Sequence, residues 1–581
     1  MKSFLLVLLA AVLLSSTYIY NETEQNKISK TRALQNVAAK KLVSFGCSPN
    51  LAAIDFADPD NAIPLLDGWG DYRMPVTVTN DSARIYFQQG INMYYGFHII
   101  ESLASFEKAT QFDNNFAMAY WGKALAYGPN INDLGYAASP DALTAMQKAK
   151  ELYSNCTSAE KALIDAMQVR YLADTTQPRE VLNQHYADAM KTVHKKFPES
   201  ADAAALYADA LMVQHPWDFY THEGKAKAWT PEIVNTLEAL LKTNPKHPGA
   251  AHYYIHAIEA SDHPEKGITV AKELPVLMPG VAHLVHMPSH IYIRSGYYNE
   301  GAEVNEAAVK SHYNYLGKYA PVAGNNFLYV MHNLHMQATC ANMDGRFAEA
   351  LKLSNDCRNS VDSGFLDFGG YLGGYAQYLY MTPIFTLIRF GKWDDILNAP
   401  AIPENRIYAK LIWHYARGLA FARKQDEDRA TRELDAMRKY MTDPQLQEHP
   451  AAFNPPAAGA GVAEKLLEGV IAEEKGDLNA AIEHLTIAMT KEDAMLYNEP
   501  KDWVHPVRQY LGATLIKAGR TREAEKMFRE DLKQNPNNGW SLTGLATVML
   551  LQSKMNESVK LQQEAKKAFA RADVKITTPV Y

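Results

Sequence analysis

Apolar residues recur at intervals of three and four through most of the chain, and this spacing predicts amphipathic helices. The clearest unit lies near the C-terminus, in HPVRQYLGATLIKAGRTREAEKMFREDLKQNP. Gly519 separates its two predicted helices, because glycine commonly ends a helix. Gly512 and Ala524 are small where the two helices must approach each other, and Phe528 supplies bulk beside them. Few segments alternate as strands do, so the pattern predicts an all-α fold.

Small residues recur at matching places in about eight segments between residues 83 and 572. Examples are Gly90, Ser289, Ala338, Gly418 and Gly469. With the closing Pro536, this pattern resembles a tetratricopeptide (TPR) repeat. The resemblance implies an α-α superhelical solenoid of about eight helical hairpins, in which the first helix of each pair lines a concave groove. The phrases HPGAAHYYIHAIEAS and HLVHMPSHIYIRSG also resemble a group of mostly bacterial, exported TPR proteins, which implies the fold and no particular activity.

The N-terminus has the pattern of an export signal. Lys2 precedes an apolar run, and residues 1–20 are interpreted as a signal peptide or an N-terminal anchor, about 17 residues being short for a membrane span. We therefore expect an exported, periplasmic or secreted chain. The remaining expected divisions are an irregular arm at 21–80, helical repeats at 81–245, histidine-rich TPR units at 246–360 and further units at 361–572.

An aromatic loop at residues 215–232 interrupts the repeats, and it is consistent either with a lid over the groove or with surface packing. Cys340 and Cys357 are close enough to pair across one hairpin, or the cysteines are buried free thiols. The formal net charge of −7, without a long basic run, argues against nucleic-acid binding through a basic face.

Histidines gather on one predicted wall of the groove. In three consecutive units they fall at positions 2, 5 or 9 of the first helix, which share one helix face. The resemblance to TPR repeats implies that these positions face the groove. The predicted binding groove consists of His252, His256, Glu259, His283, His286, His290, His332 and His335.

Two functions fit this wall. The first is recognition of a protein or peptide by a polar groove. The second is binding of zinc or copper by the seven histidines, because neutral imidazole is a common metal ligand. Met287, Met331 and Met336 lie nearby in sequence and would suit copper, although methionine is also an ordinary core residue.

Sequence motifs give little support for an enzyme. In HYYIH, Tyr253 stands where a zinc-protease helix has its glutamate, although His252, His256 and Glu259 share one helix face. No nucleophile elbow or phosphate-binding loop is found. The stretch NEPKDWVHPVRQ is expected to cap the following helix through Glu499 or Asp502, with a peptide-gripping Trp503 as the alternative. The sequence thus favours an exported TPR scaffold over a metalloprotein or metalloenzyme.

Overall fold

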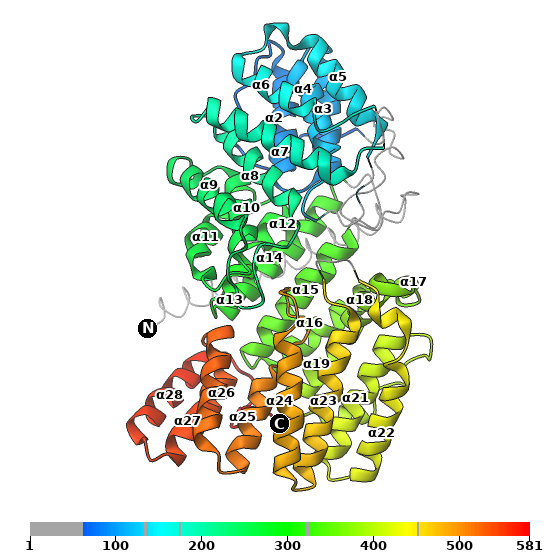
Figure 1. The fold of residues 1–581 in the computed structure, drawn as a ribbon, viewed down its shortest axis with the longest axis vertical. Coiled ribbons are helices and arrows are strands. Elements are labelled where there is room, and N and C mark those ends of the chain that lie inside the picture. Colours follow the sequence, from blue (N-terminus) through cyan, green and yellow to red (C-terminus); the bar gives the residue numbers. More distant parts are fainter. Residues whose placement is uncertain (1–61, 133–135, 137, 174–175, 320–325, 450–452) are drawn as a thin grey trace, which may run out of the picture.

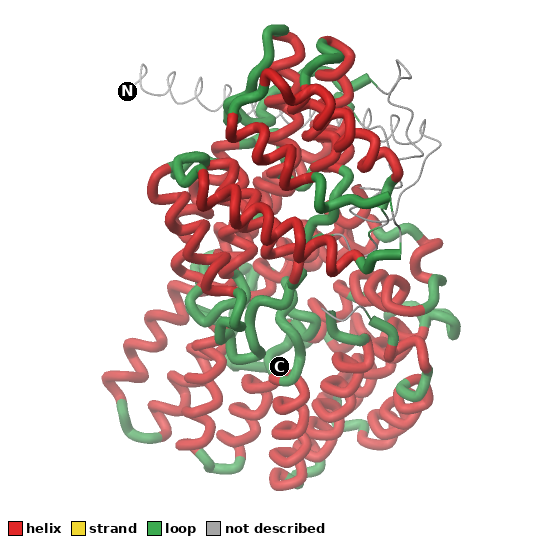
Figure 2. The backbone as a smooth tube through the Cα atoms, turned by 45° about the horizontal axis from the view of Figure 1, so that its top comes forward, coloured by secondary structure: helices red, strands yellow, loops and turns green. Residues whose placement is uncertain are grey.

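The computed structural model describes residues 62–132, 136, 138–173, 176–319, 326–449 and 453–581. The proposed signal peptide and most of the predicted arm therefore lie outside the described residues. The described chain consists of helices and their connections, with a single isolated bridge between Tyr220 and Ala226 (Figures 1 and 2). None of the described helices is both long and apolar enough to cross a bilayer.

The N-terminal half contains α2 (Asp81–Tyr95), α3 (Ile99–Phe112), α4 (Ala117–Ala126), α5 (Pro140–Leu152), η3 (Tyr153–Asn155), α6 (Ser158–Met167), α7 (Arg179–Lys196), α8 (Ala201–Gln214), α9 (Thr230–Thr243), α10 (Pro248–Ile258), η4 (Pro264–Gly267), α11 (Ile268–Leu277), α12 (Ala282–His286), α13 (Pro288–Arg294) and α14 (Tyr298–Leu316).

The C-terminal half contains α15 (Asn326–Met343), α16 (Phe347–Ser360), α17 (Ser363–Leu366), α18 (Gly370–Tyr380), α19 (Thr382–Arg389), α20 (Trp393–Leu397), α21 (Ile407–Arg423), α22 (Glu427–Tyr440), η5 (Pro444–Gln447), α23 (Pro456–Glu474), α24 (Leu478–Asp493), α25 (Val507–Lys517), α26 (Thr521–Gln534), α27 (Gly539–Leu551) and α28 (Met555–Ala568).

Successive helices pack as antiparallel hairpins, and the repeat signature explains why. A Cβ on Gly512 in α25 would lie 2.6 Å from Cζ of Phe528 in α26, so only glycine allows the two helices to approach this closely. Gly519 joins them with a φ of +71°, a conformation that glycine adopts without strain. The all-α, TPR-like solenoid predicted from the sequence is confirmed.

The apolar interior forms two large clusters, one within residues 63–319 and one within residues 330–581. In Figure 1 the helices up to α14 form the upper body, and α15 and the later helices form the lower body. The histidine-bearing α10, α12 and α13 belong to the first body and α15 begins the second. The candidate site therefore lies at the junction of the two cores.

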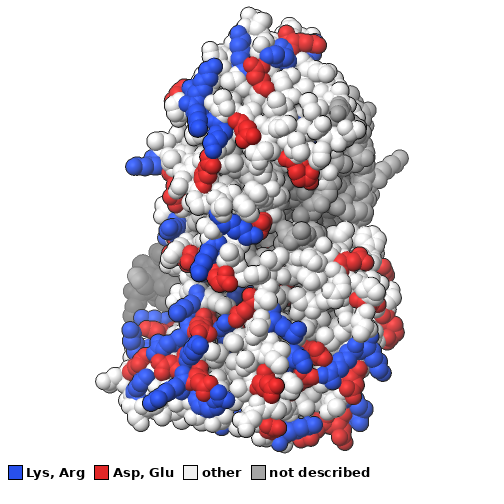
Figure 3. Space-filling view, in the orientation of Figure 1, with Lys and Arg blue, Asp and Glu red and all other residues white. Residues whose placement is uncertain are grey.

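The described part of the predicted arm, residues 62–80, is held against α2. Gln89 accepts a hydrogen bond from the Leu66 amide and Gln88 accepts one from the Met74 amide, at 2.9 and 2.8 Å. Cys156, Cys340 and Cys357 are free thiols, so Cys340 and Cys357 do not pair. Lysine, arginine, aspartate and glutamate are interspersed on the face shown in Figure 3.

Candidate metal centre

Helix α10 presents two histidines to the junction because they lie one turn apart. His247 caps this helix, with its Nδ1 accepting a hydrogen bond from the Ala250 amide at 3.1 Å, and Pro248 occupies the first turn. A Cβ on Gly249 would lie 2.3 Å from Cδ1 of Tyr95, so glycine lets α10 lie directly against α2. As a result, Nδ1 of His252 reaches the Tyr95 carbonyl oxygen at 2.6 Å.

The next three histidines come from a helix that proline divides. Pro288 has no amide hydrogen, so the helical run ends as α12 at His286 and restarts as α13. His283 and His286 lie on the first segment and His290 on the second.

Three side chains form what we call the first histidine cluster: His252, His256 and His283. One ring nitrogen of each lies within 4.8 Å of the others, and Nε2 of His252 is 3.0 Å from Nε2 of His283. All three are buried, with exposed fractions of 0, 2 and 5%. Burial lowers the pKa of each below its usual value, so neutral rings with available lone pairs are favoured.

The second histidine cluster consists of His286, His290 and His332, the last contributed by α15. Its ring nitrogens also converge within 4.8 Å. Nε2 of His286 lies 2.8 Å from Nε2 of His290 and 3.1 Å from Nε2 of His332. Burial lowers the pKa of His286 and His332 well below the usual value, whereas Glu259 outweighs burial at His290 and raises its pKa.

Outward-facing partners determine which nitrogen of each ring carries the proton. Asn305 donates through Nδ2 to the Gly301 carbonyl at 2.7 Å, so its Oδ1 faces His286 and accepts from Nδ1 at 2.7 Å. Nδ1 of His290 lies 2.6 Å from Oε2 of Glu259, where it must also carry a proton. In their neutral forms His286 and His290 therefore point two Nε2 lone pairs at each other.

The first cluster has the same arrangement, with Nδ1 protons directed outward and Nε2 lone pairs directed inward. His252 donates its Nδ1 proton to a carbonyl, and Nδ1 of His256 lies 2.9 Å from Oε1 of Glu259. Nε2 of His256 is then a lone-pair donor, and it is buried without a hydrogen-bond partner among the described residues. Outer hydrogen bonds of this kind are what orient metal-ligating histidines.

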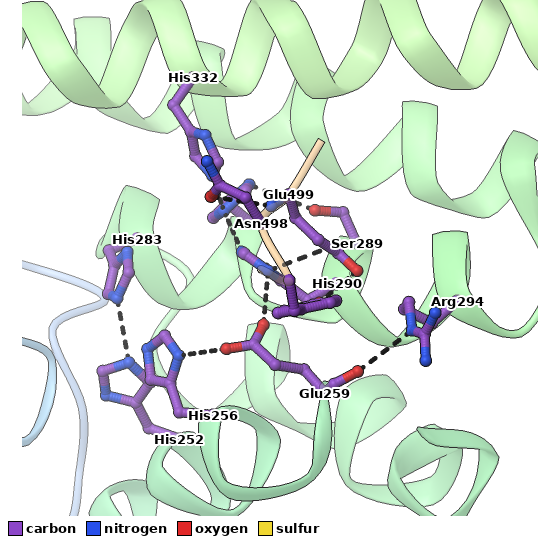
Figure 4. A network of polar contacts seen from close by, with 12 residues as sticks. His252, His256, Glu259, His283, Ser289, His290, Arg294, His332, Asn498 and Glu499 are labelled. Atoms are coloured by element: carbon purple, nitrogen blue, oxygen red, sulfur yellow. Dashed lines mark hydrogen bonds and ion pairs between the residues drawn. The ribbon is translucent and has the colours of Figure 1, made fainter. Parts of the chain in front are cut away.

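Glu259 joins the two clusters. Its two carboxylate oxygens contact one histidine in each cluster, His256 and His290 (Figure 4). Burial alone would raise the pKa of Glu259, but these two rings outweigh burial and lower it to about 2. The ionised Glu259 therefore acts on Nδ1 atoms and leaves the Nε2 atoms free, which differs from the two-histidine, one-carboxylate ligand set that the sequence allowed.

Glu499, which the sequence pattern assigned to a helix cap, belongs instead to this site and comes from the connection between α24 and α25. Its Oε2 lies 3.4 Å from Nδ1 of His290, and Tyr497 donates a hydrogen bond to its other oxygen. Burial raises the pKa of Glu499 to about 8, with Glu259 adding to the rise. The expected helix cap is wrong: α25 begins without a side-chain cap at Pro506, and Glu492 accepts from the Val507 amide instead.

Aromatic rings cover the first histidine cluster. The Phe97 ring centroid lies 4.4 Å from that of His252, and Phe97 holds a left-handed φ of +56° that non-glycine residues rarely adopt. Trp217, from the aromatic loop, packs edge-on against His256 at 5.1 Å. This loop thus contacts the cluster at one residue.

The structure brings seven of the eight predicted residues together and separates one. His335 lies against Tyr378 at 5.1 Å between centroids and belongs to neither cluster, although it is one turn beyond His332 on α15. Six of the seven predicted groove-lining histidines are buried between helices and do not line an open groove, whereas His332 is half-buried. Met287 and Met331 lie in the two apolar cores.

A cleft of about 990 Å³ adjoins the outer side of this site. Arg294, Tyr497 and Asn498 line it, and Arg294 donates from Nε to the Glu259 carbonyl oxygen at 3.2 Å. The cleft therefore adjoins Arg294, which contacts Glu259, the residue that contacts both clusters.

Fold and site together define a helical-repeat protein with a buried pair of three-histidine clusters. No protein-family model matches the chain, and no curated protein sequence does. Among solved structures it is similar to human IFIT1 in a dimer with m7Gppp-AAAA, at 14% identity over 85% of this chain and 92% of that chain, with a TM-score of 0.31. It is also similar to yeast Tom70, at 10% identity over 82% and 90% of the chains and a TM-score of 0.28. Likeness at this level transfers no function.

Proposed function

We propose that this chain is a helical-repeat metalloprotein that binds two metal ions, copper or zinc, one in each histidine cluster. The observation that carries the proposal is the 2.8 Å approach of Nε2 of His286 to Nε2 of His290, while both Nδ1 atoms face acceptors. Two lone pairs at this distance repel each other unless a metal ion or a proton lies between them, and Glu259 favours the proton because it raises the pKa of His290 against the effect of burial. One proton can relieve one such pair, but each cluster contains three converging nitrogens.

The chemistry of the donors supports copper or zinc over other cations. Every inward-facing donor is an imidazole nitrogen, and imidazole suits zinc and copper, whereas magnesium and calcium prefer oxygen. The ligands come from four helices of a packed scaffold and their outer nitrogens are held by Tyr95, Asn305 and Glu259. A scaffold that orients the rings before the ion arrives lowers the cost of binding.

The test is a metal count on tag-free protein after loading with copper or zinc and removal of loose ions. Wild type is expected to retain two ions per chain. His256→Ala and His332→Ala should each lose the ion of one cluster, whereas His335→Ala, on the same helix as His332, should retain two. Absence of bound metal in wild type, or an equal loss in His335→Ala, overturns the proposal.

Recognition of a protein or peptide by an exported scaffold is the second candidate function. The cleft of about 990 Å³ supports it, because it is large enough for a ligand and is lined by Tyr297, an aromatic side chain that is 42% exposed. Co-purification from the native compartment tests it. Tyr297→Ala should lose a captured partner and Phe368→Ala, which removes an exposed aromatic outside the lining of this cleft, should not; equal capture by both variants refutes this candidate.

A further inference from the structure

The balance of charge at the two histidine clusters distinguishes between the candidate ions. All six ligands are neutral imidazoles in their metal-binding form. Among the described residues, Glu259 and Glu499 are the carboxylates within ion-pair distance of a cluster histidine. Two zinc ions bring four positive charges against at most two negative ones, and unbalanced buried charge is costly. Two copper(I) ions bring two charges. The ionised Glu259 balances one of them, and Glu499, whose pKa is raised to about 8, balances the other once it loses its proton.

The number of ligands fits copper(I). Each cluster offers three nitrogens, and no further His, Cys, Asp or Glu belongs to either cluster among the described residues, so zinc would need water as its fourth ligand. Copper(I) is stable with three nitrogen ligands, and copper binds nitrogen sites more strongly than the other divalent first-row metals when it is oxidised.

The two clusters are immediate neighbours. The ring centroids of His283 and His286, which belong to different clusters, are 6.2 Å apart, and so are those of His256 and His290. These distances between the clusters are close to the 5.9 Å that separates the ring centroids of His256 and His283 within the first cluster. Ions held by the inward nitrogens would therefore face each other closely enough to share one small bridging ligand, as in two-metal sites.

We infer that the two histidine clusters hold a pair of copper(I) ions that together bind one molecule of dioxygen. This inference rests on the proposed function. Each copper(I) loses one electron and becomes copper(II), and dioxygen gains both electrons and becomes a peroxide bridging the two ions. No proton or additional reductant enters this step, and it reverses when peroxide returns the two electrons.

The enclosure of the site fits a ligand of this size. The cluster residues His252, His256, His286 and His290 are at most 6% exposed, and Phe97 and Trp217 cover one side. A diatomic, apolar molecule can reach such a site through small fluctuations of the packing, whereas a peptide cannot.

The experiment loads the full chain with copper(I) without oxygen, counts the copper, and then adds air-saturated buffer. The expected result is uptake of one dioxygen per two copper ions, a new near-ultraviolet peroxide-to-copper absorption, and little paramagnetic copper(II) signal, because the two ions couple. Copper retained at two per chain without oxygen uptake, or with a full mononuclear copper(II) signal, overturns the inference and leaves the proposed metal binding intact. Failure to retain any copper or zinc overturns both.

Matched variants on α15 complete the test. His332→Ala should retain one copper and lose oxygen uptake, whereas His335→Ala should behave as wild type. Circular dichroism and a thermal melt show whether each variant is folded. Zinc-loaded wild type, which cannot transfer electrons, should take up no oxygen; uptake by the zinc form or by His332→Ala contradicts a paired copper site.

Discussion

Replacing Glu259 by glutamine removes one negative charge from between the two histidine clusters while preserving the size of the side chain. Glu259 lies 2.9 Å from Nδ1 of His256 and 2.6 Å from Nδ1 of His290. Because one carboxylate contacts a ligand in each cluster, the substitution should weaken the binding of both metal ions, not of one alone.

The magnitude follows from two independent estimates. Loss of an outer partner of a metal-ligating histidine typically costs 10–100-fold in affinity, or about 1.4–2.7 kcal/mol. An ion bound to the far nitrogen of the ring would lie roughly 6–7 Å from the carboxylate, and at an effective dielectric constant of ~20 one charge at that distance contributes about 2.5 kcal/mol. Both estimates place the loss near 2 kcal/mol for each ion.

A chelator competition titration measures the dissociation constant of each ion in wild type and Glu259→Gln. The matched control is Glu265→Gln, because Glu265 also contacts a histidine, His263, at 3.2 Å, but both side chains are more than half exposed. Glu265→Gln should match wild type. A change of less than about twofold in Glu259→Gln, or weakening of only one ion, would refute the role given to this carboxylate.

Three further substitutions test the surrounding structure. Burial lowers the pKa of His335 to about 3, so His335 stays neutral in the folded protein but protonates near pH ~6.5 in the unfolded chain, and stability should fall as the pH drops below 6.5. Between pH 7.5 and 5.5, urea titrations of the metal-free proteins should show wild type losing about 1.4 kcal/mol more unfolding free energy than His335→Gln. Equal losses in the two proteins would contradict a buried, neutral His335. Gly249→Ala places a Cβ 2.3 Å from the Tyr95 ring and should cost about 1–3 kcal/mol and weaken the first-cluster ion, as measured by melting and metal titration. Gly512→Ala places a Cβ 2.6 Å from Phe528 and should cost about the same stability but leave the metal count at two; a lower count would show that the strain reaches the site.

Much of the fold could be predicted from local pattern. The hairpin of α25 and α26 follows from Gly512, Gly519 and Phe528, because residues close together in sequence determine both the tight helix packing and the left-handed turn. The spacing of the histidines likewise placed His252 beside His256, since residues four apart share a helix face.

The division into two clusters could not be predicted from the sequence. His283 and His286 lie on the same short helix, yet they join different clusters, because His283 meets His252 of α10 whereas His286 meets His290 of α13 and His332 of α15. His335 fits the repeat register as well as His332 does, but it packs against Tyr378. Glu499 reaches His290 from a distant connection, and a contact of that kind leaves no periodic signal in the sequence.

Anomalous X-ray scattering at the copper edge, from crystals of the copper-loaded chain, shows directly where the metal ions bind. Two strong peaks per molecule are expected, one within bonding distance of His252, His256 and His283 and one within bonding distance of His286, His290 and His332. A single peak, or peaks located only on surface side chains, would contradict the proposed binding of two ions.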